Sequence, residues 1–195
     1  MNDYDFLKIR DEVIKMVKEA NDSPNNFFGD TVFNFHILPV VKHSLNLGKV
    51  LKADLEVLEL AALLHDYAGI LNFEYYKDHH EHGARLAKDI LMELNYPEEK
   101  IKQVQDCILN HRGSVFRKKE SIEEKIIASA DAMAHITELP DMFYLTYGIH
   151  KHKTKEGIEW LRKKIEKSWN KIELDEGKEL VRKDFEIAMY LLNKF

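Results

Sequence analysis

The sequence contains very little of three residue types that often shape small proteins. Among its 195 residues there is one cysteine, Cys107, and there are only four prolines and eight glycines. A single cysteine excludes an internal disulfide and a zinc site built from cysteines, and it suits a reducing cytoplasm, where we expect the protein to be located. The scarcity of proline and glycine signals few turns and favours long helices.

Other absences narrow the class of protein. The net charge of −5 gives no support to a protein held on nucleic acid by bulk charge, so we expect no nucleic-acid partner. We expect no membrane contact either, because no apolar run approaches the length of a membrane span and the first residues, MNDYDFLKIRDEV, are charged rather than signal-like. Apolar residues make up 45% of the chain and charged residues 32%, which is typical of a soluble globular protein, and the length suits one domain over residues 1–195. The ten histidines are the exception that needs an explanation.

Apolar residues recur with helical spacing along most of the chain, without the alternation that is typical of strands. The sequence therefore predicts an all-α fold, a helical bundle with two additional C-terminal helices. Two capping signals predict helix starts, Asp78 with Glu81 and Ser121 with Glu124. The other predicted helices are residues 4–20, 34–51, a helix that Asp54 caps and Gly69 ends, one that Pro97 starts, and two long charged helices at about 152–171 and 176–194.

Several polar residues share the apolar faces of these helices. In the segment AALLHDYAG, residues 61–69, an apolar run ends abruptly in His65 and Asp66. His111 continues an apolar series at helical spacing, Asp131 follows Ile127 by four residues, and His36 lies in the first turn of an apolar helix. Burying imidazoles and carboxylates is costly unless a partner compensates them.

Each of these residues also has an ordinary structural interpretation. A lone buried histidine is usually a hydrogen-bonded core residue, and a buried aspartate usually pairs with lysine or arginine. The combination favours a metal, because one divalent cation would satisfy several of these groups, and neutral imidazole and carboxylate are ligands for manganese, nickel, cobalt, zinc and iron.

The pattern of a histidine, an adjacent His-Asp pair that closes an apolar helix, and a distant aspartate resembles the HD-domain superfamily of metal-dependent phosphohydrolases. The matching segments are HILPVVKHSLNLGKVL, LELAALLHDYAG, HHEHGARLAKDIL, ILNHRGS and IIASADAMAHI. The resemblance covers a core of about residues 30–140 and leaves out the C-terminal helices at about 151–195. It implies an HD-type helical bundle that holds one or two divalent transition-metal ions per chain.

Carried over by position, the resemblance implies the metal ligands His36, His65, Asp66 and Asp131. His80 and His111 stand where the binuclear branches of the superfamily place ligands for a second metal, with Asp66 bridging the ions. His79, His80 and His82 compete for one of these positions. If the site holds one ion, His80 and His111 would contact substrate phosphate instead.

The implied reaction is the attack of a metal-activated water on a phosphate ester, with a nucleotide or another small phosphorylated molecule as substrate. Asp66 would orient the water, and a protonated His80 or His111 would assist the leaving oxygen. Lys42 and Arg112 are candidates for binding the phosphate, as is the run at 117–119, which a solvated loop would equally explain. We expect His43, His150 and His152 at the surface, and we assign no role to His135.

Three alternatives stay open at this stage. The same six ligands resemble the mixed-valence di-iron oxygenases of this superfamily, which cleave C–C or C–P bonds with dioxygen. A degenerate HD domain would be a non-catalytic binding module, although no primary ligand is missing here, and a plain helical scaffold with buried polar networks needs no metal. The C-terminal helices would pack on the domain, close over the site or form a homodimer contact, and the apolar stripe of Leu161, Ile165, Trp169 and Ile172 favours core packing.

Overall fold

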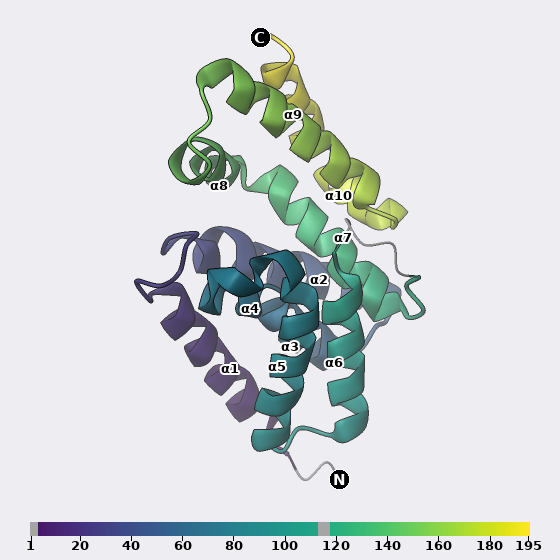
Figure 1. Cartoon of the computed structure of the whole chain (residues 1–195). Helices are drawn as coiled ribbons and strands as arrows, with labels where there is room; N and C mark the ends of the chain where they lie inside the picture. The colour runs from purple at the N-terminus through teal and green to yellow at the C-terminus, as the bar shows by residue number, and fades with distance from the viewer. Residues whose placement is uncertain (1–3, 113–117) are drawn as a thin grey trace.

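The computed structural model describes residues 4–112 and 118–195, and its regular elements are helices (Figure 1). The prediction of an all-α fold is confirmed, because no strand occurs within these two ranges. Nor does any helix within them combine the length and the apolar character needed to cross a membrane. The elements in chain order are α1 (Phe6–Asn21), η1 (Phe33–Ile37), α2 (Leu38–Leu51), α3 (Leu55–Leu64), α4 (Tyr67–Leu71), η2 (Phe73–Asp78), α5 (His79–Glu93), α6 (Glu98–Asn110), α7 (Ile122–Thr137), α8 (Leu139–Phe143), η3 (Tyr144–Ile149), α9 (Thr154–Lys171) and α10 (Asp175–Leu192).

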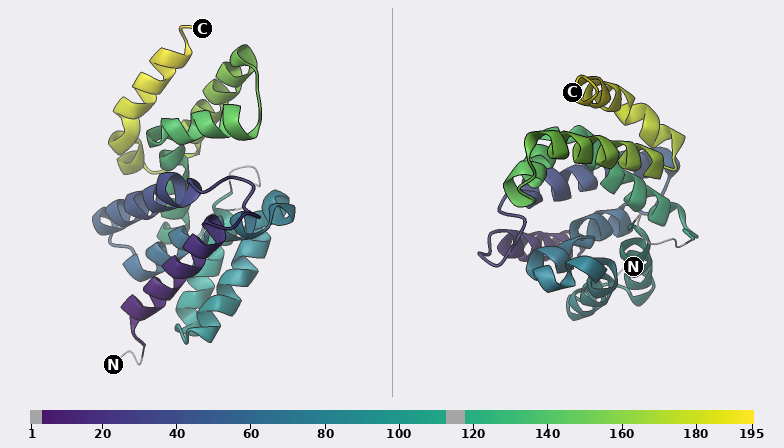
Figure 2. Two further views of the ribbon diagram at one scale, coloured as in Figure 1. Left: turned by 90° about the vertical axis from the view of Figure 1, so that its left-hand side faces the viewer. Right: turned by 45° about the horizontal axis from the view of Figure 1, so that its top comes forward.

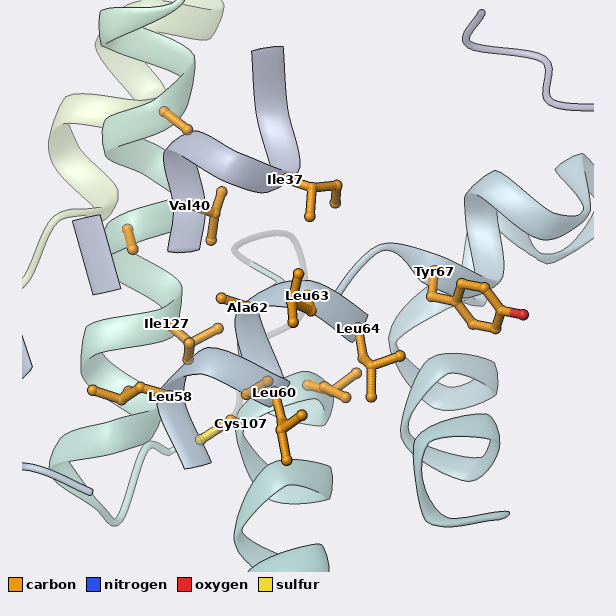
Figure 3. Packing of buried hydrophobic residues seen from close by; sticks show 14 of the residues in the cluster. Ile37, Val40, Leu58, Leu60, Ala62, Leu63, Leu64, Tyr67, Cys107 and Ile127 are labelled. Carbon is orange, nitrogen blue, oxygen red and sulfur yellow. The ribbon is translucent and has the colours of Figure 1, made fainter. Parts of the chain in front are cut away.

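Helix α3 forms the centre of the bundle. Every residue from Leu60 to Leu64 is buried, and the helix packs against α1, α2, α6 and α7. Figure 3 shows side chains of α3 among those of Ile37, Val40, Cys107 and Ile127, which come from four other elements. Because burying a leucine contributes about 1.5–3 kcal/mol, this apolar run explains why the chain organises around α3.

The capping predictions had mixed outcomes. Asp54 caps α3, since its carboxylate accepts hydrogen bonds from the backbone N–H groups of Glu56 and Val57. The reciprocal hydrogen bonds between Ser121 and Glu124 at the start of α7 are present as predicted. The capping box expected at Asp78 is wrong: this side chain makes no capping hydrogen bond, because η2 runs directly into α5 and leaves no extended capping residue.

Helices α9 and α10 pack on each other and on α7, at the end of the molecule opposite the N-terminus in Figure 1 and in the left view of Figure 2. Their positions agree with the prediction within two residues at each end. Leu161, Ile165 and Ile172 are buried and the Trp169 ring stacks on Phe185, so the predicted apolar stripe is part of the core. The short elements α8 and η3, which connect α7 to α9, were not predicted.

Candidate metal centre

The helix that carries the His-Asp pair breaks at that pair. We predicted that it would run to Gly69, but α3 ends at Leu64 and α4 begins at Tyr67. Adjacent residues of a continuous helix project about 100° apart, so an unbroken helix would have separated the two side chains. At the break, Asp66 adopts φ −108° and ψ 3°, and both His65 and Asp66 reach the same centre.

Three histidines around this centre are oriented in the same way. The Nδ1 atoms of His65, His79 and His111 lie 2.8, 2.8 and 2.6 Å from backbone carbonyl oxygens three residues earlier in the chain. A carbonyl oxygen only accepts hydrogen bonds, so Nδ1 carries the proton and donates it in each case. In its neutral form each ring therefore presents the lone pair of Nε2 to the centre, which is the arrangement that metal-binding histidines commonly have.

The first group of candidate ligands consists of His36, His65 and Asp131, all of which are buried. The Nε2 atoms of His36 and His65 lie 3.1 Å apart, and Oδ1 of Asp131 lies 3.4 Å from Nε2 of His36. These residues come from η1, from the end of α3 and from α7, so the packing of α3 between its neighbours brings them together.

The second group consists of Asp66, His79 and His111. The Nε2 atoms of His79 and His111 lie 3.1 Å apart, and Oδ1 of Asp66 lies 3.2 and 3.6 Å from them respectively. Helix α5 supplies His79, and His111 follows the end of α6. Gly83 permits the close approach of these helices, because a Cβ atom there would lie 3.2 Å from the Ile108 side chain.

Asp66 lies between the two groups. Its Oδ2 atom is 3.2 Å from Nε2 of His36 and 3.4 Å from Nε2 of His65, on the side of the first group. Its Oδ1 atom faces His79 and His111 in the second group. The two oxygens of this one carboxylate thus face two separate sets of imidazole nitrogens.

The donor set fits metal ions. Since His79 and His111 both carry their proton on Nδ1, two lone pairs face each other across 3.1 Å with no hydrogen between them. Such an arrangement is repulsive unless a cation or an added proton lies between the rings. A separation of 3.1 Å also suits neighbouring ligands of one ion, since metal–nitrogen bonds are about 2.0–2.1 Å long.

The electrostatics of the centre keep both carboxylates ionised. Burial opposes the charge of Asp66, but the neighbouring histidines outweigh it and hold the pKa of Asp66 well below its usual range. Burial likewise opposes the charge of Asp131, and Lys171 together with the histidines holds its pKa well below the usual range. Both aspartates are therefore available as anionic ligands at neutral pH.

The buried histidines differ in their titration. Burial alone would lower the pKa of His65, but the charges of Asp66 and Asp131 and the hydrogen bonds raise it to about 9. Burial lowers the pKa of His111 to about 4, so its ring is neutral at pH 7. A neutral ring suits the role of His111 as a metal ligand, and its role as a protonated acid toward the leaving oxygen stays a prediction.

A further layer of residues surrounds Asp131. Lys171, near the end of α9, forms an ion pair with its Oδ2 atom. His135 lies one helical turn after Asp131, with its Nε2 atom 3.7 Å from Oδ1 and its ring stacked on that of His36. Burial lowers the pKa of His135 well below its usual value, which keeps the ring neutral beside the centre.

A cavity of about 330 Å³ opens onto both groups of ligands. Among the predicted substrate-binding residues, Arg112 lines this cavity. Lys42 does not line it: this residue lines a separate hollow with His43 and Thr137. Of the basic run at 117–119, Arg117 falls outside the described residues, and Lys118 and Lys119 pair with Glu120 and Glu173.

Two sequence-based expectations about histidines need correction. His80, our candidate ligand, is buried but belongs to neither group, since one residue along α5 rotates the side chain by about 100°. Of the three histidines that compete for this position in the sequence, His79 is the one in the second candidate group. His43, expected at the surface, is buried with its Nε2 atom 3.2 Å from Oγ1 of Thr137. His150 is exposed and His152 partly exposed.

The residues that line the cavity on the side of the C-terminal helices were not among the predicted site residues. Asp141, Met142, Tyr144 and Leu145 come from α8 and η3, and Lys164, Lys167, Ser168 and Lys171 come from α9. None of them carries a motif of its own. The spacing of the α9 lysines, three and four residues apart, was a usable signal, because it places them on one face of a helix.

Comparisons with known proteins agree with this architecture. A family model described as the HD domain matches residues 35–136, which is more than half of the chain. No match to a curated protein was found.

The solved structures that resemble the chain share its fold at low sequence identity. The crystal structure of Bacillus subtilis YpgQ is 20% identical, with a TM-score of 0.73 over 97% of this chain and 94% of that chain. The same protein in complex with ADP is 18% identical, with a TM-score of 0.71 over 95% and 94% of the two chains. A predicted HD superfamily hydrolase from an uncultured Thermotogales bacterium is 24% identical, with a TM-score of 0.58 over 82% and 84%.

Proposed function

The chain belongs to the HD-domain family, and on this premise we propose that it is a metal-dependent phosphohydrolase acting on a nucleotide or another small phosphate ester. The observation that carries the proposal is the position of Asp66, whose two oxygens face two sets of histidine nitrogens. We propose that the centre holds two divalent ions, one in each group, with Asp66 shared between them.

The chain would hold these ions through His36, His65 and Asp131 in the first group and through His79 and His111 in the second. Manganese, nickel, cobalt, zinc or iron bound there would polarise the phosphoryl group and activate the attacking water. Hydrogen bonds from three of the imidazoles to backbone carbonyls keep the ligand nitrogens aimed at the centre before any ion binds.

Arg112 supports the assignment of a phosphate ester as substrate. It lines the cavity directly after His111, and its guanidinium donates a hydrogen bond to the backbone carbonyl of Lys77. This bond positions the guanidinium at the edge of the second group, where its remaining N–H groups would bind phosphoryl oxygens.

Aromatic rings at the cavity support a nucleotide in particular. Phe28 and Tyr76 line the cavity with ring centroids 5.1 Å apart, and the Phe73 ring is stacked on Tyr76 at 5.7 Å. Phe73 and Tyr76 are each 45% exposed, so part of each ring is available for contact with a planar ligand. The ADP complex of YpgQ, a protein of the same fold, is consistent with a small phosphorylated ligand here.

Metal content and turnover on the same preparation test the proposal. The protein would be purified without chelators and without oxygen, its metals measured by elemental analysis, and its activity assayed on nucleotides and on bis(p-nitrophenyl) phosphate. We expect about two divalent ions per chain and hydrolysis that a chelator abolishes and added metal restores.

Other outcomes would contradict the proposal. No bound metal after soaking with each candidate ion would exclude the metal centre. Two irons per chain with dioxygen consumption and no phosphate release would favour the oxygenase alternative.

A further inference from the structure

Helix α9 presents a row of lysines to the cavity at the metal centre. Lys164, Lys167 and Lys171 all line this cavity, and they recur at intervals of three and four residues on one face of the helix. The helix lies outside residues 35–136, the segment that the HD-domain model matches. The three lysines are therefore additional to the candidate metal ligands, all of which lie within the segment that the family model matches.

The three ammonium groups differ in their partners. Lys171 is neutralised by its ion pair with Asp131. Within residues 4–112 and 118–195, neither Lys164 nor Lys167 has a carboxylate oxygen within 4.0 Å. Among the described residues, these two ammonium groups therefore face the cavity without a carboxylate in direct ion-pair contact.

The environment of Lys164 makes a bound anion favourable. This side chain is partly buried, and burial lowers its pKa, with smaller contributions from Lys171 and Lys167, although the charges of Asp131 and Asp66 act in the opposite direction. A lysine whose charge is disfavoured in this way gains from an anionic ligand, which supplies the missing compensation. Lys167, on the next turn, is exposed at the mouth of the cavity.

Asp66 and Asp131 face the candidate metal ions. These ions, together with Arg112, would bind the phosphoryl group that water attacks. We propose that Lys164 and Lys167 form a separate subsite beside the metal centre, which binds a second phosphoryl group of the same substrate. The preferred substrates are then esters with two or more linked phosphates, such as nucleoside diphosphates or triphosphates, rather than monophosphates. The reaction that these substrates would undergo rests on the proposed function. The subsite itself concerns only the binding of a second phosphoryl group.

Two stable probes test the subsite without turnover. Methylenediphosphonate carries two linked phosphonate groups and methylphosphonate carries one, and neither is hydrolysed at a P–C bond by water attack of the proposed kind. Calorimetric titration of the full chain as purified, and again after metal removal, gives the dissociation constants for both. We expect the diphosphonate to bind at least about tenfold more tightly than the monophosphonate, since charge-assisted hydrogen bonds to a second group add affinity.

The variants separate the subsite from general charge. Lys164→Met keeps the apolar stem in its partly buried position, and Lys167→Gln alters an exposed side chain, so both are expected to fold. Together they should remove the preference for the diphosphonate, and Lys167→Arg should retain it. The matched control is Lys163→Gln on the same helix, which removes an exposed lysine paired with Glu159 and should leave the preference unchanged.

Two results would overturn the subsite. In the first, the wild type binds the diphosphonate no more tightly than the monophosphonate. In the second, the preference for the diphosphonate is the same in the double variant as in Lys163→Gln. Failure of the proposed function has a different signature. If the protein binds the diphosphonate through Lys164 and Lys167 but hydrolyses no phosphate ester, the subsite is supported and the phosphohydrolase assignment is wrong.

Discussion

Lys171 of α9 and Asp131 of α7 form an ion pair that joins the C-terminal helices to the candidate metal centre. Both side chains are largely buried, with 15% and 9% of their surfaces exposed. Asp131 also faces His36 with its other oxygen, so one carboxylate connects a candidate metal group to a helix outside the family segment. The C-terminal helices therefore take part in the electrostatics of the centre as well as in the packing of the core.

This ion pair predicts how metal and stability are linked. Replacing Lys171 by methionine leaves Asp131 buried without its cation, which in other buried pairs costs about 3–5 kcal/mol. In the metal-free protein we expect the melting temperature to fall by about 6–20 °C, at about 2–4 °C for each kcal/mol. Bound metal would supply the missing positive charge, so the difference from wild type should shrink in the loaded protein. Thermal unfolding of both proteins, with and without manganese, measures the four values, and an unchanged difference would argue against metal at Asp131.

Asp66 predicts a joint loss of both candidate ions. Because its two oxygens face the two groups separately, Asp66→Ala should lower the metal content at both positions and abolish hydrolysis. The side chain is about one third exposed, so circular dichroism should remain helical. Asp89→Ala, which removes an exposed carboxylate on α5, is the control and should retain metal and turnover. Full activity in Asp66→Ala would exclude Asp66 from the centre.

Much of the fold was predictable from the sequence because the signals are local. The helix starts at Asp54 and Ser121 depend on a side chain that bonds to backbone N–H groups two or three residues away, and the apolar run of α3 marks its own burial. The break at His65 was not predictable in this way. The run continues through Tyr67 and Ala68 in apolar character, and the helix ends because two polar side chains turn toward partners on η1, α5, α6 and α7.

The composition of the site was less predictable for a related reason. Choosing between His79 and His80 requires the rotation of α5 about its axis, which depends on its packing against α6 rather than on any local signal. The lysines of α9 had regular spacing, but only the tertiary position of that helix brings them to the cavity. Local sequence therefore indicated which residue types would form the site. Long-range packing determines which of the histidines and lysines face the centre.

His79 and His80 provide a direct test of the second group. The ring of His79 faces Asp66 and His111, so His79→Ala should reduce the metal content from about two ions per chain to about one. His80 is buried outside both groups, so His80→Ala should lower the melting temperature through lost packing while the metal content stays at the wild-type value. Elemental analysis and thermal unfolding of the two variants measure both effects. Loss of metal in His80→Ala alone would show that His80 is the ligand.

His43 predicts a dependence of stability on pH that does not involve the metal centre. Burial, with a smaller contribution from Lys42, lowers the pKa of His43 from 6.5 to about 4. Between these values the unfolded chain binds a proton that the folded chain does not, so the stabilisation is present above pH 6.5 and is lost as the pH falls toward 4. The complete loss should be about 3.5 kcal/mol, given about 1.4 kcal/mol for each pKa unit, and most of it falls between pH 6.5 and pH 4.5.

Comparison of the metal-free wild type with His43→Gln isolates this contribution, because the titrations of all other groups are common to both proteins. The wild-type unfolding free energy minus that of the variant should decrease by about 2–3 kcal/mol between pH 7 and pH 4.5, as measured by urea unfolding. The metal content of the variant at pH 7 should equal that of the wild type, since His43 belongs to neither group of ligands. A difference that does not change with pH would mean that the pKa of His43 is the same in the folded and unfolded chains, which would contradict the lowered value.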